Sequence, residues 1–357
     1  MIRIVTESMS DFTQEEAKAA DLIVMPLPIR FGMEEYWDDG VSLTQDDFYA
    51  RLRVAKELPK TSQVPVKHYR KCFNRLLENP EDEVLVITGS SKLSGCYQSA
   101  CIAREACHDP ARVTVLDSLN ATCAEYMLVD QALRYRREGV SDMQTMLAKL
   151  RDVMAHYKII GMAADLKYLV MGGRLSPLVG KLGNRLSIKP TLKIEDGIVS
   201  KAGMVHGMAK GRAWYIEQLK ECPPDPDVPV YIGGADCPET VALIKSQIEA
   251  ANLGIQDIRC VKIGCLIGTY VGPDRIVAAN GASSLYAGVM EKSLISTAIC
   301  SIGFTRFFVI KCASIMHRII ITSIVAAIIG KIFPPTVHIL LASLATRRTE
   351  PSFNFMA

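Results

Sequence analysis

The 357-residue sequence predicts an α/β protein whose first half contains a mostly parallel sheet. Short apolar runs alternate with longer segments that carry apolar residues at helical spacing. Strands of parallel sheets are covered by helices on both faces, so they read as nearly continuous apolar runs. The alternation predicts one α/β unit over residues 1–157. Its expected strands are Ile2–Val5, Leu22–Met25, Val84–Ile87 and Val113–Leu116.

Helices are expected between and after these strands. Thr44 precedes the acidic Asp46 and Asp47, and negative charges stabilise the N-terminus of a helix. Ser141 stands before Asp142, where an N-cap residue is expected. The expected helices are Thr44–Ala55, Val66–Glu78, Gln98–Ala106, Ala121–Arg137 and Ser141–His156.

A second α/β unit is expected over residues 158–281. The pair Asp196-Gly197 separates two apolar stretches, which is a hairpin signal. Gly268–Pro273 reads as a strand followed by a turn. The expected strands are Ile159–Ala163, Thr191–Ile194, Ile198–Ala202, Val228–Ile232, Ile258–Ile263 and Thr269–Ala278, and the expected helices are Lys210–Cys222 and Pro238–Ala251.

Residues 282–357 differ in composition and are expected to form an apolar, helical extension of unknown role. Residues 291–357 carry a net charge of +5, which leaves −2 for the rest of the chain. Lys and Arg interrupt the apolar stretches so often that no uncharged run reaches the roughly 18 residues of a membrane-spanning helix. Membrane contact through residues 293–345, an added helical layer and a poorly folded appendage remain alternatives.

The composition excludes several classes of protein. The first 290 residues have no basic run and no interleaved aromatic and Arg pattern, which argues against a nucleic-acid surface. Eleven Cys without C-x-x-C spacing suggest neither a disulfide framework nor a metal site. The N-terminus lacks the features of a signal peptide. We therefore expect a cytoplasmic protein, with peripheral membrane association through the extension as an alternative.

One candidate site follows the apolar run Val84–Ile87. Ser90, Ser91 and Ser94 stand with two glycines just before an expected helix. The carboxyl edge of a parallel sheet is the usual ligand position in open α/β folds, and hydroxyls and free N–H groups there would bind an anion or a carboxylate. Ser94 is the best-placed candidate, and Gly95 would allow close approach of backbone to ligand. The alternative is that these serines are turn and cap residues.

Three further segments carry candidate polar groups. Pro65 restricts the residue before it to extended geometry, so Thr61–Gln63 is expected to be a loop. Arg174 follows a glycine pair that ends an apolar helical piece, where Gly172 is an expected helix C-cap. Tyr270 lies in the Gly268–Pro273 segment. Each segment taken alone also fits a purely structural role.

Taken together, these segments resemble the DegV family in order and spacing over roughly residues 1–280. The matching segments are Thr6-Glu-Ser-Met-Ser-Asp11, Pro26-Leu27 with Tyr36 and Asp38, Thr61-Ser-Gln63, Leu93-Ser-Gly-Cys-Tyr-Gln-Ser-Ala100, Asp117-Ser118, Gly172-Gly-Arg-Leu-Ser176 and Ile188-Lys-Pro190.

The resemblance implies a fold and a function. It implies two α/β domains with a long-chain fatty acid in a tunnel at their interface. It further implies a bacterial, non-enzymatic lipid-binding subunit without a cofactor. Such a subunit presents the fatty-acid carboxyl group to a separate ATP-dependent kinase subunit, and the acyl-phosphate feeds phospholipid synthesis.

The resemblance also implies roles for individual residues. Thr61 and Ser94 would hydrogen-bond the carboxylate, with Ser62 and Gly95 beside them, and Arg174 would dock the kinase. Tyr270 stands where the family has a His; it stays neutral at physiological pH but still donates a hydrogen bond. Other departures are Glu7 for a usual Asp, Cys96 for a usual Thr and Asp274 for a usual Gly.

Two other functions remain as hypotheses. A serine-dependent lipid hydrolase or acyltransferase would use Ser94 as its nucleophile, which requires a base within hydrogen-bond reach. The histidines His68, His108, His156 and His206 have no evident link to Ser94, and the Gly-x-Ser-x-Gly motif is absent. The third hypothesis is a membrane-associated structural protein that depends on the C-terminal extension.

Overall fold

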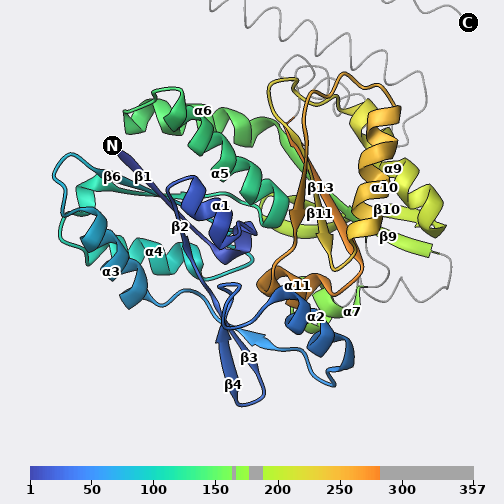
Figure 1. The fold of residues 1–357 in the computed structure, drawn as a ribbon, viewed down its shortest axis with the longest axis horizontal. Helices are drawn as coiled ribbons and strands as arrows, with labels where there is room; N and C mark the ends of the chain where they lie inside the picture. The colour runs from blue at the N-terminus through green and yellow to red at the C-terminus, as the bar shows by residue number, and fades with distance from the viewer. Residues whose placement is uncertain (163–165, 177–187, 282–357) are drawn as a thin grey trace, which may run out of the picture. The chain divides into compact units, whose positions relative to one another are not determined.

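The computed structural model describes residues 1–162, 166–176 and 188–281 (Figure 1). The expectations for residues 282–357, including membrane contact through residues 293–345, lie outside the described residues. Within the described ranges, every helix is too short or too polar to cross a membrane.

The first sheet is fully parallel, as predicted. Its strand order is β2-β1-β6-β7, and each neighbouring pair runs in the same direction. A single-turn 3-10 helix, Ser8–Ser10, and the short helix α1, Gln14–Ala19, connect the first two strands. The strands are β1 (Ile2–Glu7), β2 (Leu22–Met25), β6 (Glu83–Thr88) and β7 (Val113–Asp117).

Helices cover both faces of this sheet, which explains its apolar strands. Helices α3 (Val66–Leu76) and α4 (Cys96–Glu105) lie on one side, and α5 (Thr122–Arg137) and α6 (Met143–His156) lie on the other (Figure 1). Val84 and Val86 of β6 pack into the core on the α3 side. Leu85 and Ile87 pack into the core on the α5 side.

The helix starts follow capping chemistry, with one correction. The Thr44 side chain accepts a hydrogen bond from the Asp47 N–H and caps α2 (Gln45–Val54), as predicted. The predicted cap Ser141 is wrong. Asp142 is the N-cap of α6, because its Oδ1 accepts the Thr145 N–H at 2.8 Å, whereas Ser141 lies one residue too early.

The second sheet is mixed and has the order β10-β9-β8-β13-β11-β12. The pair β11 and β12 is parallel, and the other neighbours are antiparallel. The predicted hairpin is confirmed: Asp196 and Gly197 have φ of 50° and 77°, which a tight turn between twisted strands requires. The strands are β8 (Tyr157–Met162), β9 (Ile188–Glu195), β10 (Ile198–His206), β11 (Val230–Ala235), β12 (Ile258–Lys262) and β13 (Arg275–Gly281).

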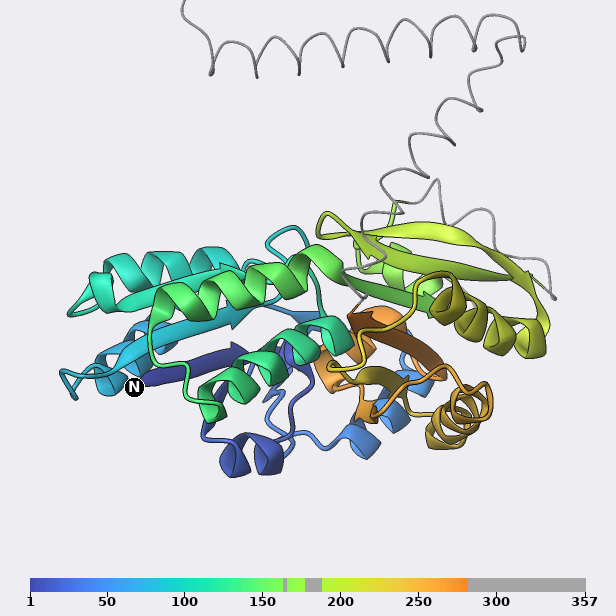
Figure 2. The ribbon, with the colours of Figure 1, turned by 90° about the horizontal axis from the view of Figure 1, so that it is seen from above.

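Helices α9 (Gly207–Glu221) and α10 (Pro238–Ala250) cover one face of the second sheet (Figure 2). Ile232 of β11 packs against these helices, whereas its neighbour Tyr231 joins the same core as α5. Helix α5 therefore packs against both sheets. Helix α6 ends at His156, and the first strand of the second sheet, β8, begins at Tyr157. The division of the chain into two domains at this point stays a prediction.

A small antiparallel sheet with the order β4-β3-β5 was not predicted. It consists of β3 (Pro28–Phe31), β4 (Glu34–Trp37) and the two-residue strand β5 (Lys60–Thr61). The expected loop at Thr61–Gln63 is therefore wrong for Thr61, which pairs with Ile29. Ser62 and Gln63 follow the strand, as expected.

The expected strand at Gly268–Val271 is also wrong, because these residues belong to helix α11 (Cys265–Val271). Asp38 accepts the N–H groups of Cys265 and Leu266 at 3.3 and 3.1 Å, and Asp11 accepts that of Gly264 at 2.8 Å. These carboxyl groups satisfy the free N–H groups at the start of the helix. The predicted helix end at Gly172 is confirmed, because Gly172 is the C-cap of α7 (Lys167–Met171).

Candidate functional site

The loop of residues 89–95, here called the Ser94 loop, leads from β6 into α4. The Ser90 carbonyl accepts hydrogen bonds from the N–H groups of Leu93 and Ser94, both at 3.0 Å. The Ser94 hydroxyl accepts the Cys96 N–H at 3.3 Å at the start of α4, whose N-cap residue is Gly95. The Ser94 side chain is partly exposed. Ser94 therefore has a structural role, and its hydroxyl proton is still available to a ligand.

The Thr61 segment meets the Ser94 loop. Strand β5 ends at Thr61, and the Ser62 N–H then donates to the Pro28 carbonyl at 3.3 Å. The Gln63 side chain lies against Gly95, where an added Cβ would stand 2.8 Å from Gln63 Oε1. A side chain at position 95 would therefore displace the amide group of Gln63.

Tyr270 and Arg174 complete this cluster from the second half of the chain. The Tyr270 hydroxyl forms a short hydrogen bond with Thr61 Oγ1. The Arg174 guanidinium lies over the Tyr270 ring, with 4.2 Å between Cζ and the ring centroid. Arg174 Nε also donates to the Leu93 carbonyl at 3.2 Å, and Nη1 donates to the Gly172 carbonyl at 2.7 Å. Arg174 is thus a bound group at the Ser94 loop and not a freely solvated charge.

These polar groups lie at one pocket. All six residues selected from the sequence (Thr61, Ser62, Ser94, Gly95, Arg174 and Tyr270) line a cavity of about 180 Å³. The rest of its lining is mostly apolar and comes from both halves of the chain. It includes Met9, Leu27, Leu93, Ala121, Ile159, Ile160, Leu169, Leu192, Ile194, Val199, Leu266, Ile267, Val271 and Val277. The arrangement suits a ligand with a long apolar part and one polar end.

Two buried carboxyl groups support the wall that carries Tyr270. Burial raises the pKa of Asp11 to about 8 and also raises the pKa of Asp38, while hydrogen bonds to each group oppose the shift. In addition to the N–H of Gly264, Asp11 accepts the Thr122 hydroxyl at 2.5 Å. Both carboxyl groups belong to the first half of the chain and bind the start of α11, which ends with Tyr270 and Val271.

A second pair of buried acids lies beneath the Ser94 loop. Glu7 Oε1 accepts the Gly89 N–H at 2.7 Å, and Glu125 Oε1 accepts the Thr6 hydroxyl at 3.3 Å. Burial raises the pKa of Glu7 to about 8 and that of Glu125 well above its ordinary value. A carboxylic acid that stays protonated at neutral pH adds no negative charge close to an anion site.

The hydrolase hypothesis requires a base near Ser94, and none of the four histidines in the described residues lines the pocket. The His68 ring packs on Trp37, His108 contacts Asn74, and His156 contacts the Asp152 carbonyl. His206 is the residue before α9. The described ranges also contain no cluster of His, Cys, Asp and Glu side chains suited to a metal ion.

Sequence reasoning missed several pocket residues. Gln63 belongs to a segment that the sequence did single out, but it was given no role there. The apolar lining gave no signal, because its members are ordinary core residues of separate strands and helices. These residues come together at one pocket only because both sheets pack on α5.

The fold and the pocket define a class: α/β proteins in which the second sheet, helix α11 and the loops that follow the first sheet's strands enclose a mostly apolar cavity with hydroxyl groups in its wall. The DegV family model, described as "Uncharacterised protein, DegV family", matches residues 1–279. The chain therefore belongs to the DegV family.

Individual relatives agree with this assignment. A DegV domain-containing protein of Caldanaerobacter subterraneus subsp. tengcongensis is 34% identical over 76% of this chain and 96% of its own length. A fatty acid-binding protein of Thermotoga maritima is 32% identical, with 77% and 96% covered. The crystal structure of a DegV lipid-binding protein from Thermotoga maritima has a TM-score of 0.71 at 29% identity and covers 79% of this chain and 99% of that one.

Proposed function

We propose that this protein binds a long-chain fatty acid in the pocket. The observation that carries the proposal is that Thr61 and Ser94, which are far apart in the sequence, line the same mostly apolar cavity. Hydroxyl and N–H donors bind a carboxylate, and apolar walls suit the acyl chain. Each buried methylene contributes about 0.8 kcal/mol before entropy losses, so a chain of some sixteen carbons binds mainly through apolar contact. The names of the relatives above support this reading.

The polar residues then orient one end of the ligand. Thr61 and Ser94 donate hydroxyl protons to the carboxylate, and Ser62, Gly95 and Tyr270 lie beside it. Arg174, which lies over the Tyr270 ring, adds a positive charge at the same end. The protonated state of the buried Glu7 favours this arrangement, because an ionised carboxylate there would repel the headgroup.

The further step is presentation of the carboxyl group to a separate kinase subunit. In that step a carboxylate oxygen attacks the γ-phosphorus of ATP, ADP leaves, and an acyl-phosphate forms that feeds phospholipid synthesis. This part of the proposal rests on the family resemblance, which also implies that Arg174 docks the kinase. The chain itself then acts as a lipid-binding subunit without a catalytic residue.

The test begins with mass spectrometry of small molecules released from the purified, denatured protein. We expect a long-chain fatty acid. The double variant Thr61→Ala/Ser94→Ala should then weaken fatty-acid binding roughly 100-fold, because two hydrogen bonds to a charged group together contribute about 3 kcal/mol. Ser91→Ala is the matched control, since Ser91 is exposed in the same loop and outside the pocket lining. A protein that carries no lipid and binds none afterwards would refute the proposal.

A further inference from the structure

The tip of the β9–β10 hairpin, residues 194–199, forms part of the pocket wall. Ile194 and Val199 both line the cavity and are direct cross-strand partners, so their side chains lie on the same face of the hairpin. Leu192 lines the cavity two residues before Ile194 on the same strand. A ligand in the cavity would therefore contact the inner face of this tip.

The tip extends beyond the part of the hairpin that the rest of the sheet supports. Strand β8 pairs with β9 only over Thr191–Lys193. In the described part of the chain, β10 is the last strand of its sheet and pairs with β9 alone. The register of that pair shifts between Lys201 and Gly203, and such a bulge interrupts the ladder at the base of the tip. Residues 194–199 thus stay paired within the hairpin but lie beyond the pairs that β9 forms with β8, and the bulge lies two residue pairs below them.

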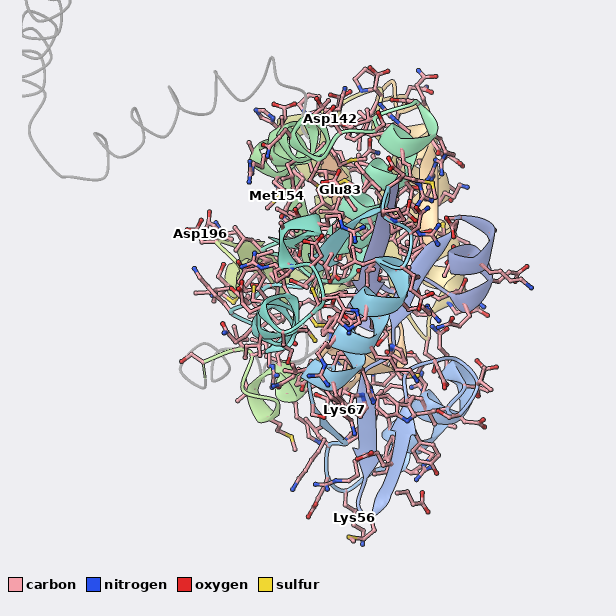
Figure 3. All side chains as sticks on the ribbon, turned by 90° about the vertical axis from the view of Figure 1, so that its left-hand side faces the viewer. Lys56, Lys67, Glu83, Asp142, Met154 and Asp196 are labelled. Carbon is pink, nitrogen blue, oxygen red and sulfur yellow. The ribbon has the colours of Figure 1, made fainter. Side chains whose placement is uncertain are left out.

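The tip contacts the first half of the molecule through the packing of Ile194 against its core and through one buried hydrogen bond. The Ser90 hydroxyl donates to the Gly197 carbonyl at 2.8 Å and is fully buried. The contact is close, because a Cβ at Gly197 would stand 2.6 Å from Ser90 Oγ. Gly197 also has a φ of +77°, which favours glycine, so both the backbone conformation and the nearby Ser90 side chain disfavour any other residue here. Figure 3 labels Asp196, the residue that precedes Gly197 in this turn.

The same serine organises the Ser94 loop. Its carbonyl accepts the N–H groups of Leu93 and Ser94, and its own N–H donates to the Asn120 carbonyl at 2.7 Å. Ser90 is therefore bonded on one side to the loop that carries Ser94 and on the other side to the hairpin that covers the apolar cavity. One residue joins the polar end of the pocket to its apolar wall.

We propose that the hairpin tip, residues 194–199, is a flap over the acyl chain, and that the Ser90–Gly197 hydrogen bond latches it closed. Opening the flap breaks this bond and bends the hairpin at the bulge, which exposes the side of the cavity to an entering or leaving lipid. The claim that the flap covers a fatty acid rests on the proposed function. The claim that the Ser90–Gly197 hydrogen bond holds the tip in place does not, because this bond involves no ligand.

Amide hydrogen exchange on the full chain tests the latch. Ser90→Ala removes the hydrogen bond to Gly197 and also the one that Ser90 Oγ accepts from the Lys92 N–H at 3.2 Å. Only the first belongs to the tip, so amides of residues 194–201 should exchange about fivefold faster, the factor that corresponds to about 1 kcal/mol. Amides of β8, β11 and β13 should not change. Ser91→Ala should leave all of them unchanged, because Ser91 binds Asp117 through its backbone N–H, which the substitution keeps. Unchanged exchange at the tip, or faster exchange throughout the sheet, would overturn the latch.

A second experiment measures the rate at which the protein releases cis-parinaric acid, a fluorescent fatty acid, into an excess of lipid vesicles. Ser90→Ala should release it about fivefold faster than the unaltered chain and Ser91→Ala. Equal release rates would overturn the flap as the step that controls lipid exchange. If the unaltered chain binds no fatty acid, the proposed function is refuted, and so is the claim that the flap covers an acyl chain. The hydrogen-exchange result still decides whether the latch exists.

Discussion

Replacing Glu7 with Gln is expected to flatten the dependence of protein stability on pH. The Glu7 side chain is fully buried, where Oε1 accepts the Gly89 N–H and Oε2 accepts the Tyr69 hydroxyl at 3.3 Å. Burial raises its pKa from 4.5 to about 8, although these two hydrogen bonds oppose the shift. A Gln side chain has the same shape, keeps the acceptor for Gly89 and cannot ionise.

The sign and size of the effect follow from the two pKa values. In the unfolded chain the carboxyl group loses its proton near pH 4.5, whereas the folded protein keeps it until about pH 8. The folded state therefore binds more protons across this window, and its stability decreases as the pH rises through it. One proton accounts for about 1.4 kcal/mol per pH unit, so the loss of stability between pH 5.5 and 7.5 is about 2 to 3 kcal/mol.

The assay is urea denaturation of the unaltered chain and of Glu7→Gln at pH 5.5, 6.5 and 7.5. The unaltered chain should lose stability as the pH rises, and Glu7→Gln should lose about 1.4 kcal/mol less per pH unit. Some loss should remain in the variant, because burial also raises the pKa of Asp11 to about 8. Glu57→Gln, at an exposed position, is the control and should behave like the unaltered chain. Parallel curves for Glu7→Gln and the unaltered chain would refute the reasoning.

The other predictions concern the wall that carries Tyr270. Tyr270→Phe removes the hydroxyl that bonds Thr61 but keeps the ring beneath Arg174. The affinity for fatty acid, measured by titration, should therefore fall about fivefold. An unchanged affinity would exclude Tyr270 from the site. Asp38→Ala leaves two N–H groups at the start of α11 without their acceptor, and should lower the free energy of unfolding by about 2 kcal/mol. Urea denaturation checks this second value, and a loss below about 0.5 kcal/mol would show that Asp38 does not support α11.

Much of the first half of the fold could be predicted from the sequence, because its signals are local. The strands of the parallel sheet are continuous apolar runs. In the second half, the Asp196-Gly197 turn could be predicted as well, because it needs only backbone chemistry. The Ser94 loop was predicted for a similar reason, since it follows directly from the end of a buried strand.

Other elements depend on partners far away in the chain. Gly268–Val271 forms a helix because Asp11 and Asp38 accept N–H groups at its start, across 253 and 227 residues for the bonds to Gly264 and Cys265. Local propensity does not contain this information. Thr61 lies in a strand only because Ile29 is its neighbour in the small sheet. The meeting of Thr61 with Ser94 followed from the family resemblance and not from the spacing of these residues.

The bonds from Asp11 and Asp38 to α11 also bear on the order in which the protein is made. Both acids leave the ribosome long before the residues of α11 that they bind. Contacts between such distant residues form late, because a large loop must close first. The pocket is thus assembled only after almost all of the described chain has been synthesised. A truncated product that ends before Gly264 would contain Thr61 and Ser94 but no binding cavity.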